Sequence, residues 1–347
     1  MLNINQLNLL GWQSFFQQQL DIDEWYNSVP VRVVEQHRNR LVVDSGSDTF
    51  QLPVTEKVSQ CVVGDWLLLN ENHDVNRVFE RKSYFARRAA GSKLEKQAIT
   101  ANVDVAFVLC SLNDDFNLNR IERYLALVNE AGCEPVVMLT KADLANDGLE
   151  KREQVQNLSS MLRVEVIDCH DVTLVNQLSD WLKPQTSIVL LGSSGVGKST
   201  LSNTLAQTQQ KTSAIREQDS KGRHTTTGRY LLKLASGAVL IDTPGMRELQ
   251  LSDVTAGLEQ TFSEIEALAS SCKFVNCSHS NEPKCAIQQA ISDGSLTERR
   301  FLNYQKLRKE NQFNTASLRE RRAHDKSLTK MYKRVQSQAV KFKKLNE

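Results

Sequence analysis

Residues 192–200 have the composition and spacing of a phosphate-binding loop. They read GSSGVGKST, match the pattern G-x-x-x-x-G-K-[ST], and lie between the apolar run SIVLL and the helix-compatible run LSNTLA. In such a loop backbone N–H groups converge on phosphate oxygens, the lysine neutralises β- and γ-phosphate charge, and the next hydroxyl ligates Mg²⁺. A Gly/Ser-rich turn that matches by chance is the alternative. The candidate nucleotide-binding residues are Gly192, Ser193, Ser194, Gly195, Val196, Gly197, Lys198, Ser199 and Thr200, with Ser199 as a Mg²⁺ ligand.

Two later segments have residue types that contact Mg²⁺ and the γ-phosphate in nucleotide hydrolases. DTPG (242–245) ends the apolar run AVLI, so we expect Asp242 beside Mg²⁺ and Gly245 beside the γ-phosphate. A surface turn is the alternative for an isolated D-x-x-G. The preceding segment KGRHTTTGRYLL (221–232) offers three hydroxyls as Mg²⁺ ligands, and a Thr-rich strand edge is the alternative for each. These candidates are Thr225, Thr226 and Thr227.

The segment TKAD (140–143) follows the apolar run EPVVML and has the residue types that recognise guanine. Asp143 can accept hydrogen bonds from N1–H and the 2-amino group of guanine, while Lys141 lies along the base. Adenine lacks the 2-amino donor, so it would leave a buried carboxylate unpaired, which is costly. T-K-x-D is common by itself, but its place at a strand end favours a base site that includes Thr140 and Ala142.

The order of these motifs along the chain is unusual. In ordinary GTPases the base motif comes last, whereas here it precedes the phosphate loop by about 50 residues. We interpret this order as a circular permutation, which leaves the site intact because ligands bind at the carboxyl ends of strands whatever their order. A fifth motif, a small S-A pair touching guanine, is expected after VEVI. The sequence there is DCHDV (168–172), so this contact is altered or absent.

The residue after DTPG bears on hydrolysis. Many GTPases have a glutamine there that orients the attacking water, whereas this chain has Met246, which cannot position water through a strong hydrogen bond. We therefore expect slow intrinsic turnover until a partner or another side chain completes the site. His224 is the internal candidate for a catalytic role, and a solvated or nucleic-acid-facing histidine is the alternative.

Three cysteines and one histidine lie close together further along the chain. Their spacing is C-x₄-C-x-H-x₅-C, and they are Cys272, Cys277, His279 and Cys285. Three thiolates and one imidazole form a closed tetrahedral set, which is typical of structural zinc. The intervening residues, KFVN and SNEPK, are too polar for a core of buried thiols. The sequence therefore predicts one structural Zn²⁺.

The pattern of apolar runs predicts the elements that carry these motifs. Short β-type runs over 31–80 indicate a small antiparallel barrel or sandwich. From about 100 to 250, apolar runs alternate with helix-length segments, which predicts parallel βαβ units and includes GRYLLKL in the series. The basic segment 81–97 is interpreted as a linker, and 255–347 is mainly helical in pattern.

Composition and charge exclude some classes of protein. A content of 40% hydrophobic and 24% charged residues excludes a wholly disordered chain. No stretch approaches the roughly 20 apolar residues of a membrane helix, and the N-terminal residues lack the features of a secretion signal. The four scattered cysteines are typical of buried thiols in a reducing compartment, so we expect a cytoplasmic protein. They are Cys61, Cys110, Cys133 and Cys169.

The formal net charge of +2 is unevenly distributed. Residues 298–347 contain 15 Lys and Arg against 5 Asp and Glu, a net charge of +10, which leaves −8 for the other 297 residues. The basic run 318–345 favours contact with RNA phosphates, and a solvated charged helix is the alternative.

Together these motifs resemble the circularly permuted GTPases that act on the small ribosomal subunit (ribosome small-subunit-dependent GTPase A). The resemblance spans about 30–300 and includes VGDW, RKS…QAITANVD, TKAD, GSSGVGKST, GRHTTT, DTPGMRE and the cysteine cluster. It implies a multidomain α/β chain with an N-terminal OB-type β-barrel, a permuted P-loop GTPase with a parallel sheet, and a C-terminal helical zinc-binding domain. It also implies GTP hydrolysis stimulated by the 30S subunit and a role in late subunit maturation.

We therefore expect a cytoplasmic GTP hydrolase, monomeric and not membrane-bound, whose partners are the 30S subunit and 16S rRNA. An RNA-binding adaptor that uses GTP as a structural ligand with little turnover is the first alternative. A GTPase acting on a protein or membrane target is the second. The expected divisions are a lead-in (1–27), an OB-fold RNA-binding barrel (28–85), a permuted GTPase domain (86–250), a zinc-binding domain (251–300) and a basic helical tail (301–347).

Overall fold

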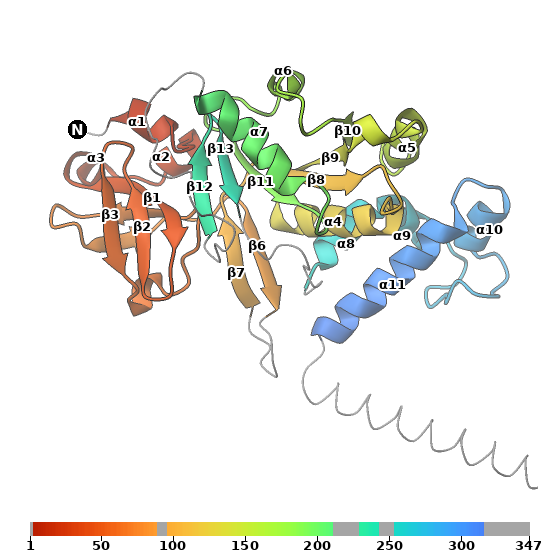
Figure 1. The fold of residues 1–347 in the computed structure, drawn as a ribbon. Helices are drawn as coiled ribbons and strands as arrows, with labels where there is room; N and C mark the ends of the chain where they lie inside the picture. The colour runs from red at the N-terminus through yellow and green to blue at the C-terminus, as the bar shows by residue number, and fades with distance from the viewer. Residues whose placement is uncertain (1–2, 89–95, 211–228, 243–252, 316–347) are drawn as a thin grey trace, which may run out of the picture.

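In the computed structural model of the chain, residues 3–88, 96–210, 229–242 and 253–315 are described. A twisted sheet runs through the molecule, and its parallel strands form the end of the sheet away from the N-terminal strands (Figure 1). The order of the parallel strands is β10-β9-β8-β11-β13. They are β8 (Val105–Ser111), β9 (Glu134–Thr140), β10 (Arg163–Val166), β11 (Ser187–Leu191) and β13 (Val239–Asp242).

Both faces of this parallel part are covered, which is why its strands are continuous apolar runs. Alternate residues of β8 belong to different cores. Phe107 packs in the cluster that includes residues of α6 (Leu174–Gln177) and α7 (Lys198–Gln210), whereas Val108 packs in the cluster that includes residues of α4 (Leu118–Ala131), α5 (Gly148–Gln156) and α8 (Thr255–Thr261).

An N-terminal unit of five antiparallel strands continues this sheet. Their order is β3-β2-β1-β4-β5, and no pairing between β3 and β5 closes the unit among the described strands. The expected OB-type barrel is therefore not confirmed, and the described strands form a five-stranded antiparallel unit in an open order. They are β1 (Val29–Gln36), β2 (Arg40–Asp44), β3 (Thr49–Pro53), β4 (Trp66–Leu69) and β5 (Val75–Val78).

Short helices accompany the N-terminal strands. Residues expected as a lead-in form α1 (Ile4–Asn8), α2 (Ser14–Gln17) and α3 (Ile22–Asn27), and a 3₁₀ turn spans Glu56–Val58. The aromatic side chains of Trp12 and Phe16 pack with Trp66 and Phe79 in one buried cluster, so α2 and the residues before it contact β4 through apolar side chains.

Two expectations about the strands are wrong. The segment 81–97 is no simple linker, because β6 (Tyr84–Arg88) and β7 (Lys96–Ala101) pair antiparallel in a hairpin that projects below the sheet in Figure 1. GRYLLKL forms β12 (Arg229–Lys233), which runs antiparallel to β13 rather than joining the parallel series. A β-type run indicates a strand but not its direction, which depends on its partner.

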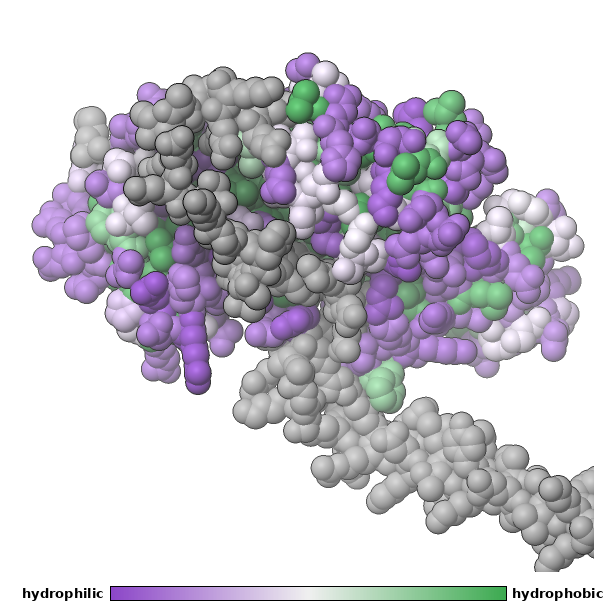
Figure 2. All heavy atoms as spheres, in the orientation of Figure 1, coloured by the Kyte–Doolittle hydropathy of each residue, from purple (hydrophilic) through white to green (hydrophobic). Residues whose placement is uncertain are grey.

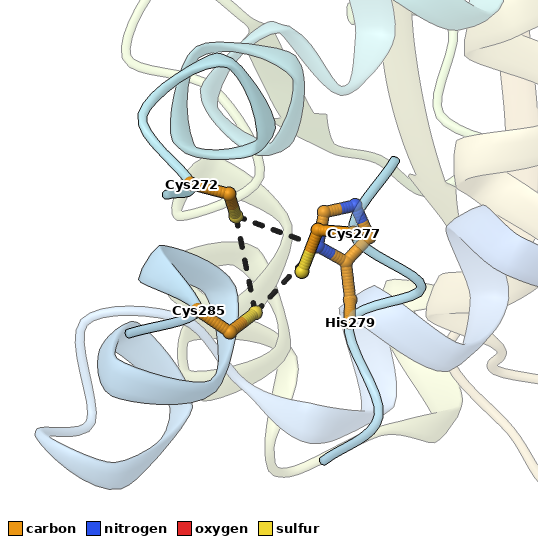
Figure 3. A group of neighbouring side chains, drawn as sticks. All are labelled: Cys272, Cys277, His279 and Cys285. Carbon is orange, nitrogen blue, oxygen red and sulfur yellow. Dashed lines mark hydrogen bonds between the residues drawn. The ribbon is translucent and has the colours of Figure 1, made fainter. Parts of the chain in front are cut away.

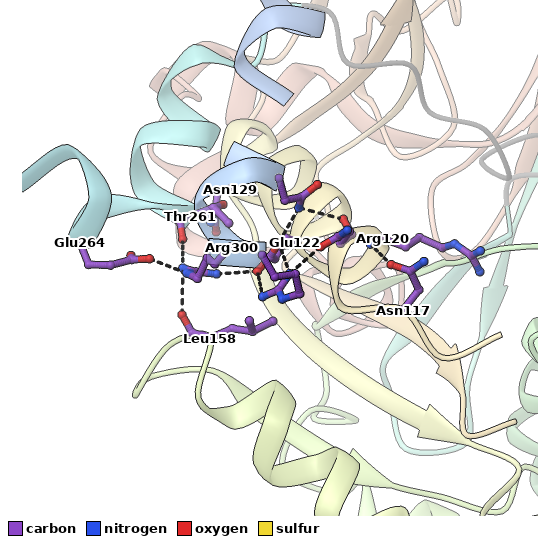
Figure 4. A network of polar contacts seen from close by, with 11 residues as sticks. Asn117, Arg120, Glu122, Asn129, Leu158, Thr261, Glu264 and Arg300 are labelled. Atoms are coloured by element: carbon purple, nitrogen blue, oxygen red, sulfur yellow. Dashed lines mark hydrogen bonds and ion pairs between the residues drawn. The ribbon is translucent and has the colours of Figure 1, made fainter. Parts of the chain in front are cut away.

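The C-terminal described residues form α8, α9 (Ser263–Ser270), α10 (Ala286–Ser292) and α11 (Glu298–Thr315). A buried ion cluster joins α11 to α4 (Figure 4). The Glu122 carboxylate is completely buried and accepts hydrogen bonds from Arg299 at 2.7 Å and Arg300 at 2.9 Å. Arg300 also pairs with Glu264. Residues 301–315 of the expected basic tail lie in α11, and its remaining residues, 316–347, lie outside the described residues.

The described surface is largely hydrophilic on the face shown in Figure 2, where apolar residues form small separate groups. In the part of the chain that the structure describes, no helix has the length and apolarity that crossing a membrane requires.

A second buried charge connects the N-terminal unit to the parallel sheet. Arg32 of β1 is completely buried, and burial lowers its pKa to about 10. Its guanidinium donates to the Gly64 carbonyl at 3.2 Å, the Asn102 carbonyl at 3.0 Å and the Ser187 hydroxyl at 2.9 Å. It also donates to the carbonyl of Leu10. Four segments that are distant in sequence thus share one donor group.

Replacing Arg32 with methionine should destabilise the protein. The Arg32→Met chain keeps most of the side-chain length but leaves these buried acceptors without their charged donor, so we expect a loss of about 3 kcal/mol or more. Arg77→Met is the matched control, since the Arg77–Glu24 pair is partly exposed and should contribute about 1 kcal/mol or less. Denaturant unfolding measures both changes, and equal losses would contradict the assignment.

Candidate nucleotide-binding site and metal centre

The predicted phosphate loop connects the carboxyl end of β11 to the first turn of α7. Gly192 and Gly197 have φ values of 146° and 104°, which side chains with a Cβ rarely adopt. A Cβ on Gly192 would also lie 2.6 Å from the carbonyl oxygen of Leu109 in β8. Glycine at this position therefore allows the loop to pass close to the neighbouring strand.

The base motif and the phosphate loop are in direct contact. The Thr140 hydroxyl at the end of β9 donates to the Val196 carbonyl at 2.7 Å. Lys141, the next residue, has a φ of 61° and precedes the 3₁₀ turn Ala142–Leu144. Lys198 donates through Nζ to the Gly192 carbonyl at 2.7 Å, so its ammonium group lies over the loop.

One cavity of about 290 Å³ brings the two motifs together. Lys141 and Asp143 lie on its wall with Lys198 and Ser199, although about 50 residues separate the two motifs. Thr140 and Ala142 do not line it, nor do Gly192, Ser193 and Val196, which belong to the loop backbone around it. Its lining residues are Lys141, Asp143, Leu144, Asp168, Cys169, His170, Ser194, Gly195, Gly197, Lys198, Ser199 and Thr200.

The loop after β10 also lines this cavity. Asp168, Cys169 and His170 occupy the position where a fifth guanine motif was expected but where its residue types are absent. The carbonyl of Cys169 accepts a hydrogen bond from Thr204 of α7 at 2.6 Å, which holds the loop against the helix. These three residues therefore lie where the fifth guanine motif was expected, although their types differ from it. The signal in the sequence that indicates this position is that they follow a parallel strand.

A polar pair that contacts the phosphate loop was not predicted from the sequence. Asp115 accepts hydrogen bonds from Ser193 at 2.9 Å and from Arg120 at 2.6 Å, and Arg120 also donates to Ser193 at 3.2 Å. The hydrogen bond from Arg120 is the largest cause of the lowered pKa of Asp115. The start of α4 is thus bound to the phosphate loop.

Asp242 lies at the end of β13, beside β11. Its carboxylate accepts a hydrogen bond from Tyr230 at 2.7 Å, and Asp242 does not line the cavity described above. Apart from Ser199, which lines the cavity, the other candidates for contact with Mg²⁺, the γ-phosphate or water lie outside the described residues. They are His224, Thr225, Thr226, Thr227 and Gly245, and Met246 lies in the same undescribed part of the chain.

The four predicted zinc ligands converge between α9 and α10 (Figure 3). The Sγ atoms of Cys272 and Cys285 are 3.9 Å apart, and each lies 3.6 Å from Nδ1 of His279. A tetrahedral zinc site with Zn–S of about 2.3 Å and Zn–N of about 2.0 Å separates its ligand atoms by about 3.5–3.8 Å. With Cys277, all ligand atoms lie within 4.8 Å of one another, so this group fits one zinc ion.

Comparison with known proteins identifies the family. The model of the RsgA GTPase family matches residues 78–252. A Vibrio parahaemolyticus protein named small ribosomal subunit biogenesis GTPase RsgA 2 is 49% identical over 96% of this chain and 93% of its own length. The chain belongs to the RsgA GTPase family. A Mesorhizobium japonicum relative, named small ribosomal subunit biogenesis GTPase RsgA, is 45% identical over 88% of this chain and 90% of its own length.

Two solved structures share this fold. YjeQ from Thermotoga maritima has a TM-score of 0.61 at 24% identity over 81% of this chain and 97% of its own. YloQ, described as a circularly permuted GTPase, has a TM-score of 0.58 at 24% identity over 84% of this chain and 98% of its own. The inferred permutation is therefore confirmed. Membership of a GTPase family makes the chain a GTP hydrolase and does not favour the adaptor alternative.

The thiols of this RsgA-family chain differ in their surroundings. Burial opposes ionisation of Cys272, but backbone N–H groups of Ala286 and Ile287 stabilise the thiolate, and its pKa lies below the usual value. In contrast, burial raises the pKa of Cys61 to about 12 and that of Cys169 to about 11. Cys61, Cys110 and Cys169 are buried as expected, whereas Cys133 is half-buried.

Removing one zinc ligand should remove the metal. In Cys272→Ser we expect the zinc content to fall from about one ion per chain towards zero, because three ligands no longer close a tetrahedral site. Elemental analysis measures the content, and thermal unfolding should show loss of the C-terminal helices at lower temperature. Cys133→Ser is the matched control, since this thiol lies outside the cluster. Equal zinc in both variants would refute the assignment.

Proposed function

We propose that this chain acts in the biogenesis of the small ribosomal subunit, by hydrolysing GTP on the 30S particle during late maturation. The names of relatives that are 45–49% identical over most of the chain support this proposal. The observation in the site that carries it is the shared cavity, where Asp143 of the base motif and Lys198 of the phosphate loop line one wall.

Within this proposal the residues divide by the part of the nucleotide that they contact. Asp143 and Lys141 recognise guanine, with Thr140 and Ala142 holding the motif. The loop 192–200 surrounds the phosphates. Ser199, Asp242 and one of the threonines 225–227 hold Mg²⁺, which neutralises charge on the phosphates when bound, and Gly245 donates its N–H to the γ-phosphate. Lys198 and Ser199 line one cavity, as these roles require.

The remaining parts of the chain serve RNA docking in this proposal. We assign an OB-type RNA-binding unit to 28–85, a zinc-binding domain to 251–300 and a basic rRNA-binding tail to 301–347, all contacting 16S rRNA. Five antiparallel strands support the first assignment and the convergent Cys₃His set supports the second. The protein acts as a cytoplasmic monomer that places the GTPase domain (86–250) on the subunit.

Purified 30S subunits should stimulate GTP hydrolysis. Met246 leaves the chain without the usual water-orienting glutamine, so completion of the site by a partner should raise kcat by about 10²-fold or more. Phosphate release, measured with and without 30S and with 50S as a comparison, tests this. Binding to 30S without stimulation would instead support the adaptor alternative.

Asp143→Asn provides the nucleotide control for that assay. The asparagine amide can still accept a hydrogen bond from N1–H of the base, but its N–H₂ group cannot accept from the 2-amino group of guanine and instead donates to the C2 carbonyl of xanthine. The variant should therefore lose GTP affinity on the order of 100-fold and gain affinity for xanthosine triphosphate. Asp147→Asn is the matched comparison, because Asp147 pairs with Lys151 and does not line the cavity. Retention of GTP by Asp143→Asn would contradict the assignment of the base motif.

We also propose His224 as the residue that positions the attacking water. It lies outside the described residues, and its place in the Thr loop before three candidate Mg²⁺ ligands supports the role. His224→Ala should keep GTP affinity within about twofold while 30S-stimulated turnover falls about 10²-fold. Steady-state kinetics and nucleotide titration separate the two effects. Unchanged stimulated turnover would remove this role.

A further inference from the structure

A tyrosine on β12 is bound directly to the proposed Mg²⁺-associated carboxylate. Tyr230 and Asp242 are opposite each other in the antiparallel register of β12 and β13. The phenolic O–H of Tyr230 donates to Oδ2 of Asp242 at 2.7 Å. Because residues that are directly opposite have side chains on the same face of the sheet, this contact follows from the strand register.

The tyrosine is held on both sides. β12 lies between β13 and β1, where Glu35 pairs with Tyr230 and Gln36 pairs with Arg229. Arg229 donates from Nη1 to the Gln36 side-chain carbonyl at 3.0 Å and to the backbone carbonyl of Ala98 at 3.2 Å. The strand that presents the phenol is therefore fixed by the N-terminal unit and by β7.

A hydrogen bond to one carboxylate oxygen limits rotation of the group and leaves the second oxygen available. Partners of this kind orient metal-associated carboxylates, and their removal typically costs about 10–100-fold in metal affinity or activity. We propose that Tyr230 is a positioning residue that orients Asp242 toward the Mg²⁺ of the bound nucleotide. This inference rests on the proposed role of Asp242.

The tyrosine hydroxyl can be tested by its effect on Mg²⁺-dependent nucleotide binding. Mg²⁺ slows the release of fluorescent GDP, and the Mg²⁺ concentration that gives half of this effect is the Mg²⁺ midpoint. In Tyr230→Phe, which keeps the ring, this midpoint should rise about tenfold. GDP affinity in EDTA should stay unchanged, because the phenol acts only through the metal-associated carboxylate. A residue with a purely structural role would change both quantities.

Tyr304→Phe is the matched control. Tyr304 donates to Oε1 of Glu266 at 2.5 Å, so this variant loses the same kind of tyrosine–carboxylate bond far from the phosphate loop. Its Mg²⁺ midpoint should equal that of the wild type. In the background of Asp242→Asn, Tyr230→Phe should add little, since the two residues act as one unit.

Several results would overturn the inference. The first is a Mg²⁺ midpoint of Tyr230→Phe that is lower than that of the wild type or within twofold of it. The others are a loss of GDP affinity in EDTA as large as the change in the midpoint, or effects of Tyr230→Phe and Asp242→Asn on the midpoint that are fully additive. Failure of the underlying assignment looks different: Asp242→Asn itself would leave the Mg²⁺ midpoint unchanged, and this would remove the roles of both residues.

Discussion

The parallel hydrogen bonding of β11 between β8 and β13 is the constraint on which the site depends. Ile188 is in register with Val105 of β8 and with Leu240 of β13, so the carboxyl ends of the three strands lie at the same edge. β9 continues the set with Thr140 opposite Ser111. Residues that follow these strands must therefore meet, whatever order the chain visits them in. This is the physical reason that a permuted chain can assemble a site for one nucleotide.

Helix α4 connects this edge of the sheet to the C-terminal helices. Near its start, Asp115 and Arg120 contact Ser193 of the phosphate loop. Two residues after Arg120, Glu122 is buried against α11. A completely buried carboxylate is tolerated because several donors satisfy it, and removing one of them would leave an uncompensated charge. This contact joins α4, which contacts the phosphate loop, to α11, which follows the metal cluster. Movement of one helix along the other would leave the buried carboxylate unpaired, at a large cost in free energy.

The N-terminal unit is attached through another buried charge at the other end of the sheet. Arg32 places its guanidinium among carbonyl and hydroxyl acceptors from four segments. The last residues of β1 also pair with β12, which holds Tyr230 beside Asp242. The N-terminal unit and the nucleotide motifs are separate segments of the sequence. In the structure, however, the N-terminal unit supports the strand that contacts Asp242.

Local spacing by itself determined the phosphate loop, TKAD, the zinc set and the buried strands that carry them, because residue type, ligand spacing and apolar period are properties of short segments. Tertiary structure decided the direction of β12, the hairpin of β6 and β7, the open order of β1–β5, and the place of Asp168–His170 in the cavity wall. It also decided which buried charges meet, as with Glu122 and Arg300. These features depend on the partner and register that a segment finds far away in the chain, and no local pattern specifies either.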